Sequence, residues 1–317
     1  MEKNIYALKN KSVLITGATG LVGAYLSEFL IYLNTHHALG IDIFALSSSE
    51  KNIINRFSAT PKLTPIIADL SIPFTPGRTF DYIIHAASPA DPYEYKTHPT
   101  KTMKTNLIGT MSLMENATHS DSKFLFISSG EVYGDTGENA ATEDTIGKID
   151  ITNVRACYPE SKRASETYTI SYASEYGIHV NIARLCYIYG PTFSSRSTRA
   201  DADFLLHAKS GTDITMHSTG TMRRTYCYVA DAVSAILHIL INGENMTAYN
   251  VANPKSVASL REFADTIANA ENIKVHAPVP DGTRFPNSVL DANRLIKTGW
   301  QPIYDLPTGI KHTLLQI

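Results

Sequence analysis

Residues 12–23 read SVLITGATGLVG, and this stretch decides the fold. The apolar, β-branched run over residues 12–16 stops at a glycine, which is typical of a buried strand, and residues 21–33 have helical character. Three glycines stand between them in the spacing G-x-x-G-x-x-G, namely Gly17, Gly20 and Gly23. In such a turn the first glycine permits the bend, the second admits a pyrophosphate and the third lets the helix pack closely, while the helix N-terminus offers N–H donors to the anion. The stretch therefore predicts a dinucleotide-binding turn.

Apolar strands and helices continue to alternate downstream. Further strands are predicted over residues 41–46, 64–68, 82–87, 124–128 and 180–184, and helices over residues 101–117 and 160–176. Short apolar strands separated by helices indicate a parallel sheet that is buried on both faces. We therefore predict an α/β fold with a Rossmann-type, doubly wound parallel sheet.

The regular alternation breaks down after Gly190-Pro191. We predict that residues 1–190 form the dinucleotide-binding domain and also carry the catalytic residues. Residues 191–317 are expected to form mainly a smaller C-terminal α/β lobe that binds substrate, with strands that can return to the main sheet. Its helices are predicted over residues 203–209, 230–241 and 260–270. Ligands bind at the carboxyl ends of the strands in such sheets, so we expect the lobe to cover that edge.

The composition excludes several classes of function. A net charge of −2 over 317 residues gives no sign of a nucleic-acid surface. Three dispersed cysteines without metal-ligand spacing predict reduced thiols in a cytoplasmic protein and no metal site. The most apolar stretch, residues 21–33, carries a serine and a glutamate and is too short to span a bilayer, and residues 1–4 show no secretory signal. We expect neither nucleic acid nor membrane as a partner.

The end of the second strand, where residues 46–51 read LSSSEK, bears on the choice of dinucleotide. An acid at this point would bind the ribose hydroxyls of NAD, and a basic residue would suit the extra phosphate of NADP. No acid stands directly at the strand end, and Lys51 comes a few residues late, so the sequence leaves both open and we take NAD as the expected cofactor. Asp69 follows the next strand, where it can accept a hydrogen bond from the adenine amino group or simply cap the strand.

Tyr158 and Lys162 stand four residues apart at the start of a predicted helix. This spacing places both side chains on one helix face, one turn apart. An ammonium group near a phenol favours the phenolate, so we expect the pKa of Tyr158 to be lowered toward neutrality. The phenolate could then take the proton of a substrate hydroxyl while the carbon below gives a hydride to nicotinamide. Ser129, at a strand end, could hydrogen-bond the same oxygen.

These signatures and several others give the chain a resemblance to extended short-chain dehydrogenases/reductases of the nucleotide-sugar epimerase/dehydratase family. The matching segments are HAAS at 85–88, NLIGT at 106–110, SSGEVYG at 128–134, ARL at 183–185, YGP at 189–191, RTYCYVAD at 224–231, YNV at 249–251 and GW at 299–300. Within the family, HAASPA at 85–90, KTN at 104–106 and CYPESKR at 157–163 resemble UDP-glucuronate decarboxylases best. The resemblance implies a catalytic triad of Ser129, Tyr158 and Lys162, with Glu131 as an additional acid-base residue and Arg224 on the substrate diphosphate.

The expected ligand contacts come from residues in and around these motifs. The protein is also expected to form a homodimer. Cofactor contacts are expected from Gly17, Thr19, Gly20, Leu21, Val22, Gly23, Ser47, Asp69, Leu70, Ala86, Ala87, Ser88, Asn106, Tyr158 and Lys162. Substrate contacts are expected from Ser88, Ser129, Tyr187, Arg199 and Arg224. Arg199 belongs to the polar, cationic loop 194–199, which either binds a phosphate or carboxylate or is a solvated loop.

Departures from the family pattern bear on the reaction. The 4,6-dehydratases have an aspartate where this chain has Gly130, which disfavours dehydration. Simple 4-epimerases usually lack Glu131, so chemistry beyond C4 is favoured, and Tyr187 replaces an asparagine that contacts the sugar nucleotide in most members. The expected activity is oxidation of a sugar hydroxyl at C4 followed by decarboxylation, as in UDP-glucuronate decarboxylases. The alternatives are a nucleotide-sugar 4-epimerase, an oxidoreductase of a nucleotide-linked polyol, and a non-catalytic NAD(P)-binding regulatory module.

Overall fold

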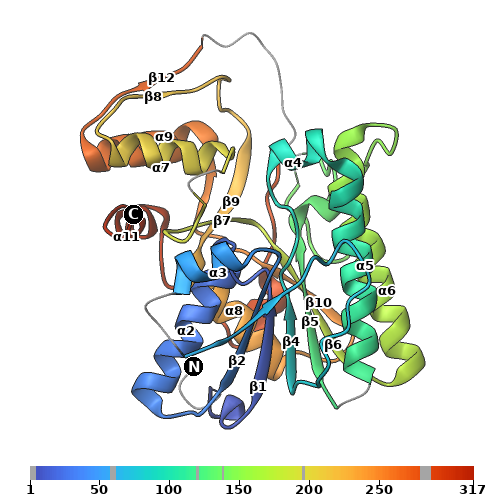
Figure 1. The fold of residues 1–317 in the computed structure, drawn as a ribbon. Coiled ribbons are helices and arrows are strands. Elements are labelled where there is room, and N and C mark those ends of the chain that lie inside the picture. Colours follow the sequence, from blue (N-terminus) through green and yellow to red (C-terminus); the bar gives the residue numbers. More distant parts are fainter. Residues whose placement is uncertain (1–4, 58–61, 119–120, 138, 195–196, 279–286) are drawn as a thin grey trace.

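A computed structural model of the protein describes residues 5–57, 62–118, 121–137, 139–194, 197–278 and 287–317. Seven parallel strands form the central sheet in the order β10-β6-β5-β4-β1-β2-β3 (Figure 1). Their bounds are Ser12–Thr16 (β1), Asp42–Ser47 (β2), Thr64–Ile67 (β3), Tyr82–His85 (β4), Lys123–Ser129 (β5), His179–Leu185 (β6) and Thr247–Val251 (β10). The prediction of a Rossmann-type parallel sheet is confirmed.

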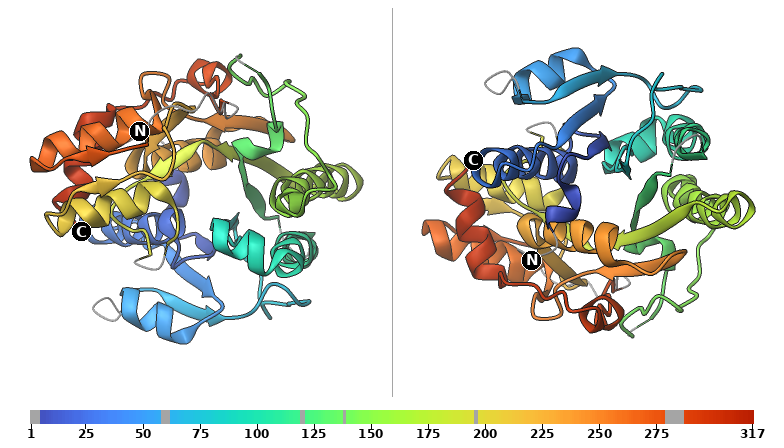
Figure 2. Two further views of the ribbon diagram at one scale, coloured as in Figure 1. Left: turned by 90° about the horizontal axis from the view of Figure 1, so that it is seen from above. Right: turned by 90° about the horizontal axis from the view of Figure 1, so that it is seen from below.

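Helices cover both faces of this sheet. The helices on one face are α2 (Leu21–His37), α3 (Glu50–Phe57) and α8 (Val229–Asn242), and those on the other are α5 (Pro99–Thr118) and α6 (Cys157–Tyr176). Alternate residues of each strand serve the two cores: Val13 and Ile15 pack with the first set, and Leu14 with the second. Both views agree that α5 and α6 run side by side (Figures 1 and 2).

The chain beyond residue 190 builds a smaller lobe and also extends the sheet. The lobe carries α7 (Ala200–Lys209), α9 (Leu260–Glu271) and the short strands β8 (Ile214–Thr215) and β12 (Val275–His276), and it stands above the carboxyl ends of the central strands in Figure 1. A second, three-stranded sheet joins β7 (Tyr187–Tyr189), β9 (Arg223–Tyr228) and β11 (Val257–Ser259). The remaining helices are α4 (Pro92–Thr97), α10 (Asn293–Lys297) and α11 (Leu306–Leu314). β10 pairs with β6 along Thr247–Val251, so one strand of the main sheet comes from the C-terminal part of the chain.

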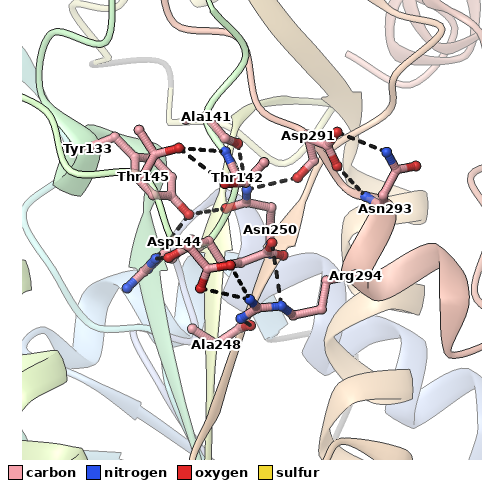
Figure 3. A network of polar contacts seen from close by, with 12 residues as sticks. Tyr133, Ala141, Thr142, Asp144, Thr145, Ala248, Asn250, Asp291, Asn293 and Arg294 are labelled. Carbon is pink, nitrogen blue, oxygen red and sulfur yellow. Dashed lines mark hydrogen bonds and ion pairs between the residues drawn. The ribbon is translucent and has the colours of Figure 1, made fainter.

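A buried polar network fastens the β5 end of the sheet to this returning strand. The fully buried Asn250 accepts a hydrogen bond from the Tyr133 hydroxyl at 2.6 Å. Its side-chain amide donates to the carbonyl oxygens of Ala141 at 2.9 Å and Asp291 at 2.8 Å (Figure 3). Tyr133 ends the short 3-10 helix Gly130–Tyr133 that follows β5. The network therefore fixes the position of the turn after Ser129 relative to the end of β10.

Among the residues that the structure describes, no helix is long and apolar enough to cross a membrane. Within the same residues, no group of three or more histidine, cysteine, aspartate or glutamate side chains gathers as a metal site would require.

Candidate active site

The glycine turn at the end of β1 leaves no room for a side chain at Gly17 or Gly23. Gly17 adopts φ +66°, and a Cβ there would lie 2.8 Å from the Cα of Ala87. A Cβ on Gly23 would lie 2.3 Å from the carbonyl oxygen of Gly17, so α2 packs directly against the turn. The N-cap of α2 is Gly20, and no side chain caps this helix end. The first N–H groups of α2, including those of Leu21 and Val22, are thus left for an anion, as a dinucleotide pyrophosphate requires.

The neighbouring strand ends carry most of the other residues expected at the cofactor. Thr19 and Ser47 join their hydroxyls at 3.2 Å, between the glycine turn and the end of β2. Ala87 donates its N–H to the Thr16 hydroxyl at 3.0 Å, which fixes the segment after β4 that includes Ala86 and Ser88. Asn106 is fully buried on α5, and its side-chain oxygen has no hydrogen-bond partner among the described residues. These positions fit a dinucleotide lying across the sheet edge.

Asp69 and Leu70 follow β3. Leu70 is buried in the core of the α5 face. The exposed Asp69 accepts a hydrogen bond from the N–H of Ser71 at 2.9 Å and lies 3.8 Å from the Lys101 ammonium. It thus caps its own turn, and both interpretations made from the sequence, the adenine contact and the cap, stay open because one carboxylate has acceptor sites for both.

Ser129, Tyr158 and Lys162 meet at the carboxyl end of β5. Ser129 ends the strand, and the other two lie on the first turns of α6. Lys162 is buried, donates to the Ile127 carbonyl oxygen at 2.8 Å and places its ammonium 6.0 Å from the centre of the Tyr158 ring. The preceding residue, Ser161, accepts a hydrogen bond from the Asn106 side-chain amide at 2.8 Å, and this bond links α6 to α5. The fold thus brings the predicted triad together.

The pKa of Tyr158 departs from the sequence-based prediction. Burial and, to a smaller extent, the charge of Glu131 raise the pKa of Tyr158 to about 12, although the hydrogen bond to Ser129 and the cations Arg155 and Arg199 act to lower it. The prediction of a lowered pKa is therefore wrong for the protein as it stands. The prediction failed because it did not account for burial. Burial also lowers the pKa of Lys162 to about 7, although the charge of Glu166 acts to raise it. The lysine charge that should favour the phenolate is therefore itself disfavoured.

Glu131 lies beside the triad and is paired with an arginine that the sequence reasoning missed. Nη2 of Arg155 donates to both Glu131 carboxylate oxygens, at 2.8 and 2.6 Å. The same guanidinium lies 4.4 Å from the centre of the Tyr95 ring, and Tyr95 stacks on Tyr158 with the ring centres 4.7 Å apart. Arg155 stands three residues before Tyr158, a position that could have been weighed, whereas Tyr95 arrives from α4 and carries no local signal.

The remaining predicted substrate residues come from the second sheet and the lobe. The Arg224 guanidinium lies 4.1 Å from the centre of the Tyr187 ring, and its Nε is buried without a hydrogen-bond partner among the described residues. Arg199 is already paired: its Nη2 donates to Asp201 at 2.7 Å and to the Ile188 carbonyl oxygen at 3.0 Å. Residues 195–196 of the same loop lie outside the described residues.

A cavity of about 320 Å³ adjoins the glycine turn. Gly20 and Ser88 line it from the sheet edge, Asp91 from the start of α4, and Arg199 from the lobe. Asp91 also binds this loop directly, since its carboxylate accepts a hydrogen bond from the Thr198 N–H at 2.8 Å. The cavity therefore lies between the dinucleotide turn and the lobe, and a ligand in it could contact both.

Comparison with known proteins agrees with this geometry. Residues 13–252 match the family described as the NAD dependent epimerase/dehydratase family. UDP-glucuronic acid decarboxylase 6 of Arabidopsis thaliana is 30% identical over 305 residues, which are 95% of this chain and 87% of the plant protein. UDP-glucuronic acid decarboxylase 1 of Danio rerio is 31% identical over 307 residues, covering 96% of this chain and 72% of the relative.

Solved structures match across almost the whole chain. The UDP-glucose 4-epimerase of Thermotoga maritima with UDP-glucose superposes with a TM-score of 0.81 at 22% identity, covering 96% of this chain and 98% of that one. DesIV, a dTDP-glucose 4,6-dehydratase from Streptomyces venezuelae with NAD bound, gives 0.81 at 20% identity and covers 96% of each chain. With its glycine turn, its Ser-Tyr-Lys cluster and these relatives, the chain belongs to the NAD dependent epimerase/dehydratase family and is an enzyme of that family.

Proposed function

We propose that the protein uses NAD to oxidise C4 of a nucleotide-activated uronic acid and then releases the sugar carboxylate as carbon dioxide, as the relatives named UDP-glucuronic acid decarboxylases do. The observation that carries the proposal is the Glu131 carboxylate, which stands beside Ser129 and Tyr158, where chemistry confined to C4 has no use for it. Gly130 precedes it in place of the acid that a dehydratase needs.

The residues of the chain divide the work as follows. Tyr158 takes the proton of the C4 hydroxyl and Ser129 binds the same oxygen. Lys162, 6.0 Å from the centre of the phenol ring, supplies a positive charge in its protonated form. The glycine turn and the adjoining strand ends would hold NAD, which when bound would supply the acceptor, and later the donor, of the C4 hydride. The C4 ketone makes the C5 carboxylate part of a β-keto acid, so the C5–carboxylate bond breaks and its electron pair passes into an enolate. Glu131 assists the protonation of C5, after which the ketone is reduced.

Incubation of the NAD-loaded enzyme with a panel of nucleotide sugars, followed by mass spectrometry, tests this function. UDP-glucuronate is expected to yield a UDP-pentose lighter by one carbon dioxide. A product of unchanged mass whose NMR spectrum shows inversion at C4 would instead establish the second candidate, a 4-epimerase, the activity named for the Thermotoga maritima protein of the same fold.

Arg224 is the proposed diphosphate clamp. Its Nε is buried and lacks a partner among the described residues, and the Tyr187 ring fixes the plane of the guanidinium. Arg224→Ala is expected to weaken UDP binding by about 1.5–3 kcal/mol, the contribution of a hydrogen bond to a charged group. Calorimetric titration of UDP measures this, with Arg223→Ala as the control because Arg223 is an exposed neighbour on the same strand. Unchanged affinity in Arg224→Ala would place the diphosphate elsewhere.

Glu131 separates the two candidate reactions. Glu131→Gln keeps the size of the side chain and removes its charge, so a 4-keto intermediate and reduced cofactor are expected to accumulate if the chemistry reaches C5. Absorbance in the reduced-nicotinamide band after addition of UDP-glucuronate reports this accumulation. Normal product formation without it would make Glu131 a structural residue and would move the 4-epimerase ahead.

Several finer assignments belong to the same proposal. We infer NAD rather than NADP because the matched family is described as NAD dependent, and tighter binding of NADP in a titration would reverse this. A substrate-binding role for residues 191–317 is supported by their share of the cavity next to the glycine turn. A cytoplasmic location is supported by the free thiols of Cys157, Cys186 and Cys227. The homodimer stays a prediction, which light scattering tests.

A further inference from the structure

Arg155 has a position that neither the triad nor the diphosphate clamp explains. It lies in the short 3-10 helix Val154–Ala156 directly before α6. Its guanidinium is 4.4 Å from the centre of the Tyr95 ring and 5.9 Å from that of Tyr158. Two stacked rings therefore form a rigid platform that holds this cation next to the reactive phenol.

The guanidinium is only partly used by its carboxylate partner. Among the described residues, the hydrogen bonds of the Arg155 side chain go to Glu131 alone, and both come from Nη2. A guanidinium has five N–H donors, so those on Nε and Nη1 remain for a further acceptor. The Arg155 side chain is 45% exposed, whereas Tyr95 and Tyr158 beneath it are 4% and 7% exposed. The Arg155 side chain is thus within reach of a ligand, whereas the rings that support it are not.

Three other cations near the reactive centre already have contacts or roles of their own. Lys162 is buried and donates to the Ile127 carbonyl oxygen. Arg199 forms a two-point ion pair with Asp201, at 3.0 and 2.7 Å. Arg224 lies against Tyr187 on the second sheet, where the diphosphate is expected. Of these four cations, all within the part of the chain that the structure describes, Arg155 is the one with donors to spare beside Tyr158.

We propose that Arg155 binds the carboxylate of the substrate sugar and thereby selects uronic acids over neutral sugars. The inference rests on the proposed function for the acidity of the sugar. One guanidinium joins both acids: Nη2 keeps Glu131 in place, while Nη1 or Nε donates a charge-assisted hydrogen bond to the sugar carboxylate. The carboxylate to be lost is then held close to Glu131 and to the phenol that starts the reaction.

Binding is measured in the NAD-loaded Tyr158→Phe background, so that substrate is not consumed. UDP-glucuronate is expected to bind more tightly than UDP-glucose, and Arg155→Met is expected to weaken UDP-glucuronate binding by about 10- to 100-fold. The affinities for UDP-glucose and UDP should stay within about twofold, because neither ligand carries the sugar carboxylate. Arg155→Lys keeps the charge but has a single nitrogen to share between the two acids. Its affinity for UDP-glucuronate should lie between that of the background variant and that of Arg155→Met. Arg223→Met serves as the matched control and should leave all three affinities unchanged.

Three results would overturn the inference: equal affinity for the acidic and the neutral sugar in the background variant, no loss with Arg155→Met, or equal losses for UDP-glucuronate, UDP-glucose and UDP. Failure of the proposed function has a different signature. If Arg155 controls the affinity for UDP-glucuronate but the enzyme with intact Tyr158 releases no carbon dioxide, the binding role stands and the reaction is another one. If carbon dioxide is released and Arg155→Met binds UDP-glucuronate normally, only the assignment of Arg155 fails.

Discussion

Tyr158→Phe is expected to lower turnover about 10²–10⁴-fold, the usual effect of losing a general acid-base group. The substitution removes one hydroxyl and keeps the ring that stacks on Tyr95, so the fold and NAD binding should persist. Burial holds the pKa of this phenol near 12, so turnover should rise with pH wherever the phenolate fraction limits the rate. The phenylalanine variant should lose that dependence.

Single-turnover measurements with UDP-glucuronate, from neutral to alkaline pH, test this expectation. Tyr168→Phe is the matched control, because Tyr168 lies on the same helix but stacks on Tyr172. Turnover near the normal rate in Tyr158→Phe would remove this hydroxyl from the mechanism. A normal pH profile at reduced rate would show that another group is the base.

Arg184→Met is expected to destabilise the protein by about 3–5 kcal/mol, because it leaves the buried Glu166 carboxylate without its counter-ion. Arg184 donates to Glu166 through Nη2 at 2.7 Å, with the two side chains 16% and 9% exposed. Its Nη1 also donates to the Tyr133 hydroxyl at 3.0 Å. The loss therefore reaches the network that holds the turn after Ser129.

Equilibrium unfolding in urea measures the change in the free energy of unfolding. The double variant Arg184→Met/Glu166→Met should recover most of it, since replacing a buried ion pair by apolar side chains is often close to neutral. Arg261→Met breaks a more exposed ion pair with Asp265 and should cost less than about 1 kcal/mol. A loss of that small size in Arg184→Met would show that water reaches Glu166.

Local patterns in the chain predicted the elements that build the site. The glycine turn could be read because its residues are consecutive, and each constraint on them, such as the Gly23 contact with Gly17, acts within one turn. Tyr158 and Lys162 could be paired because a helix fixes their spacing. The predicted strand bounds agree with the structure to within a residue or two, because an apolar run and the residues that end it are also local features. For example, β5 was predicted over 124–128 and spans Lys123–Ser129.

Properties that depend on distant residues were not predictable. Tyr95 reaches Tyr158 only because α4 packs against the segment before α6, and no pattern around residue 95 announces that contact. The direction of the Tyr158 pKa shift was predicted wrongly because spacing along a helix reports which charge is near, whereas burial depends on the whole fold. The partner of Arg199 was missed although Asp201 is two residues away, since side-chain direction in a loop is set by its surroundings.

The return of β10 to the main sheet has a consequence for the order in which the protein folds during synthesis. β6 is the partner of β10, so a nascent chain that ends before residue 247 leaves one backbone edge of β6 unpaired. That strand is apolar, with Val180, Ile182 and Ala183 buried in the finished protein. An open apolar edge invites pairing with another chain. The ribosome must therefore deliver about half of residues 191–317 before the nucleotide-binding sheet is complete, and a chain stopped at residue 190 should be recovered as aggregate.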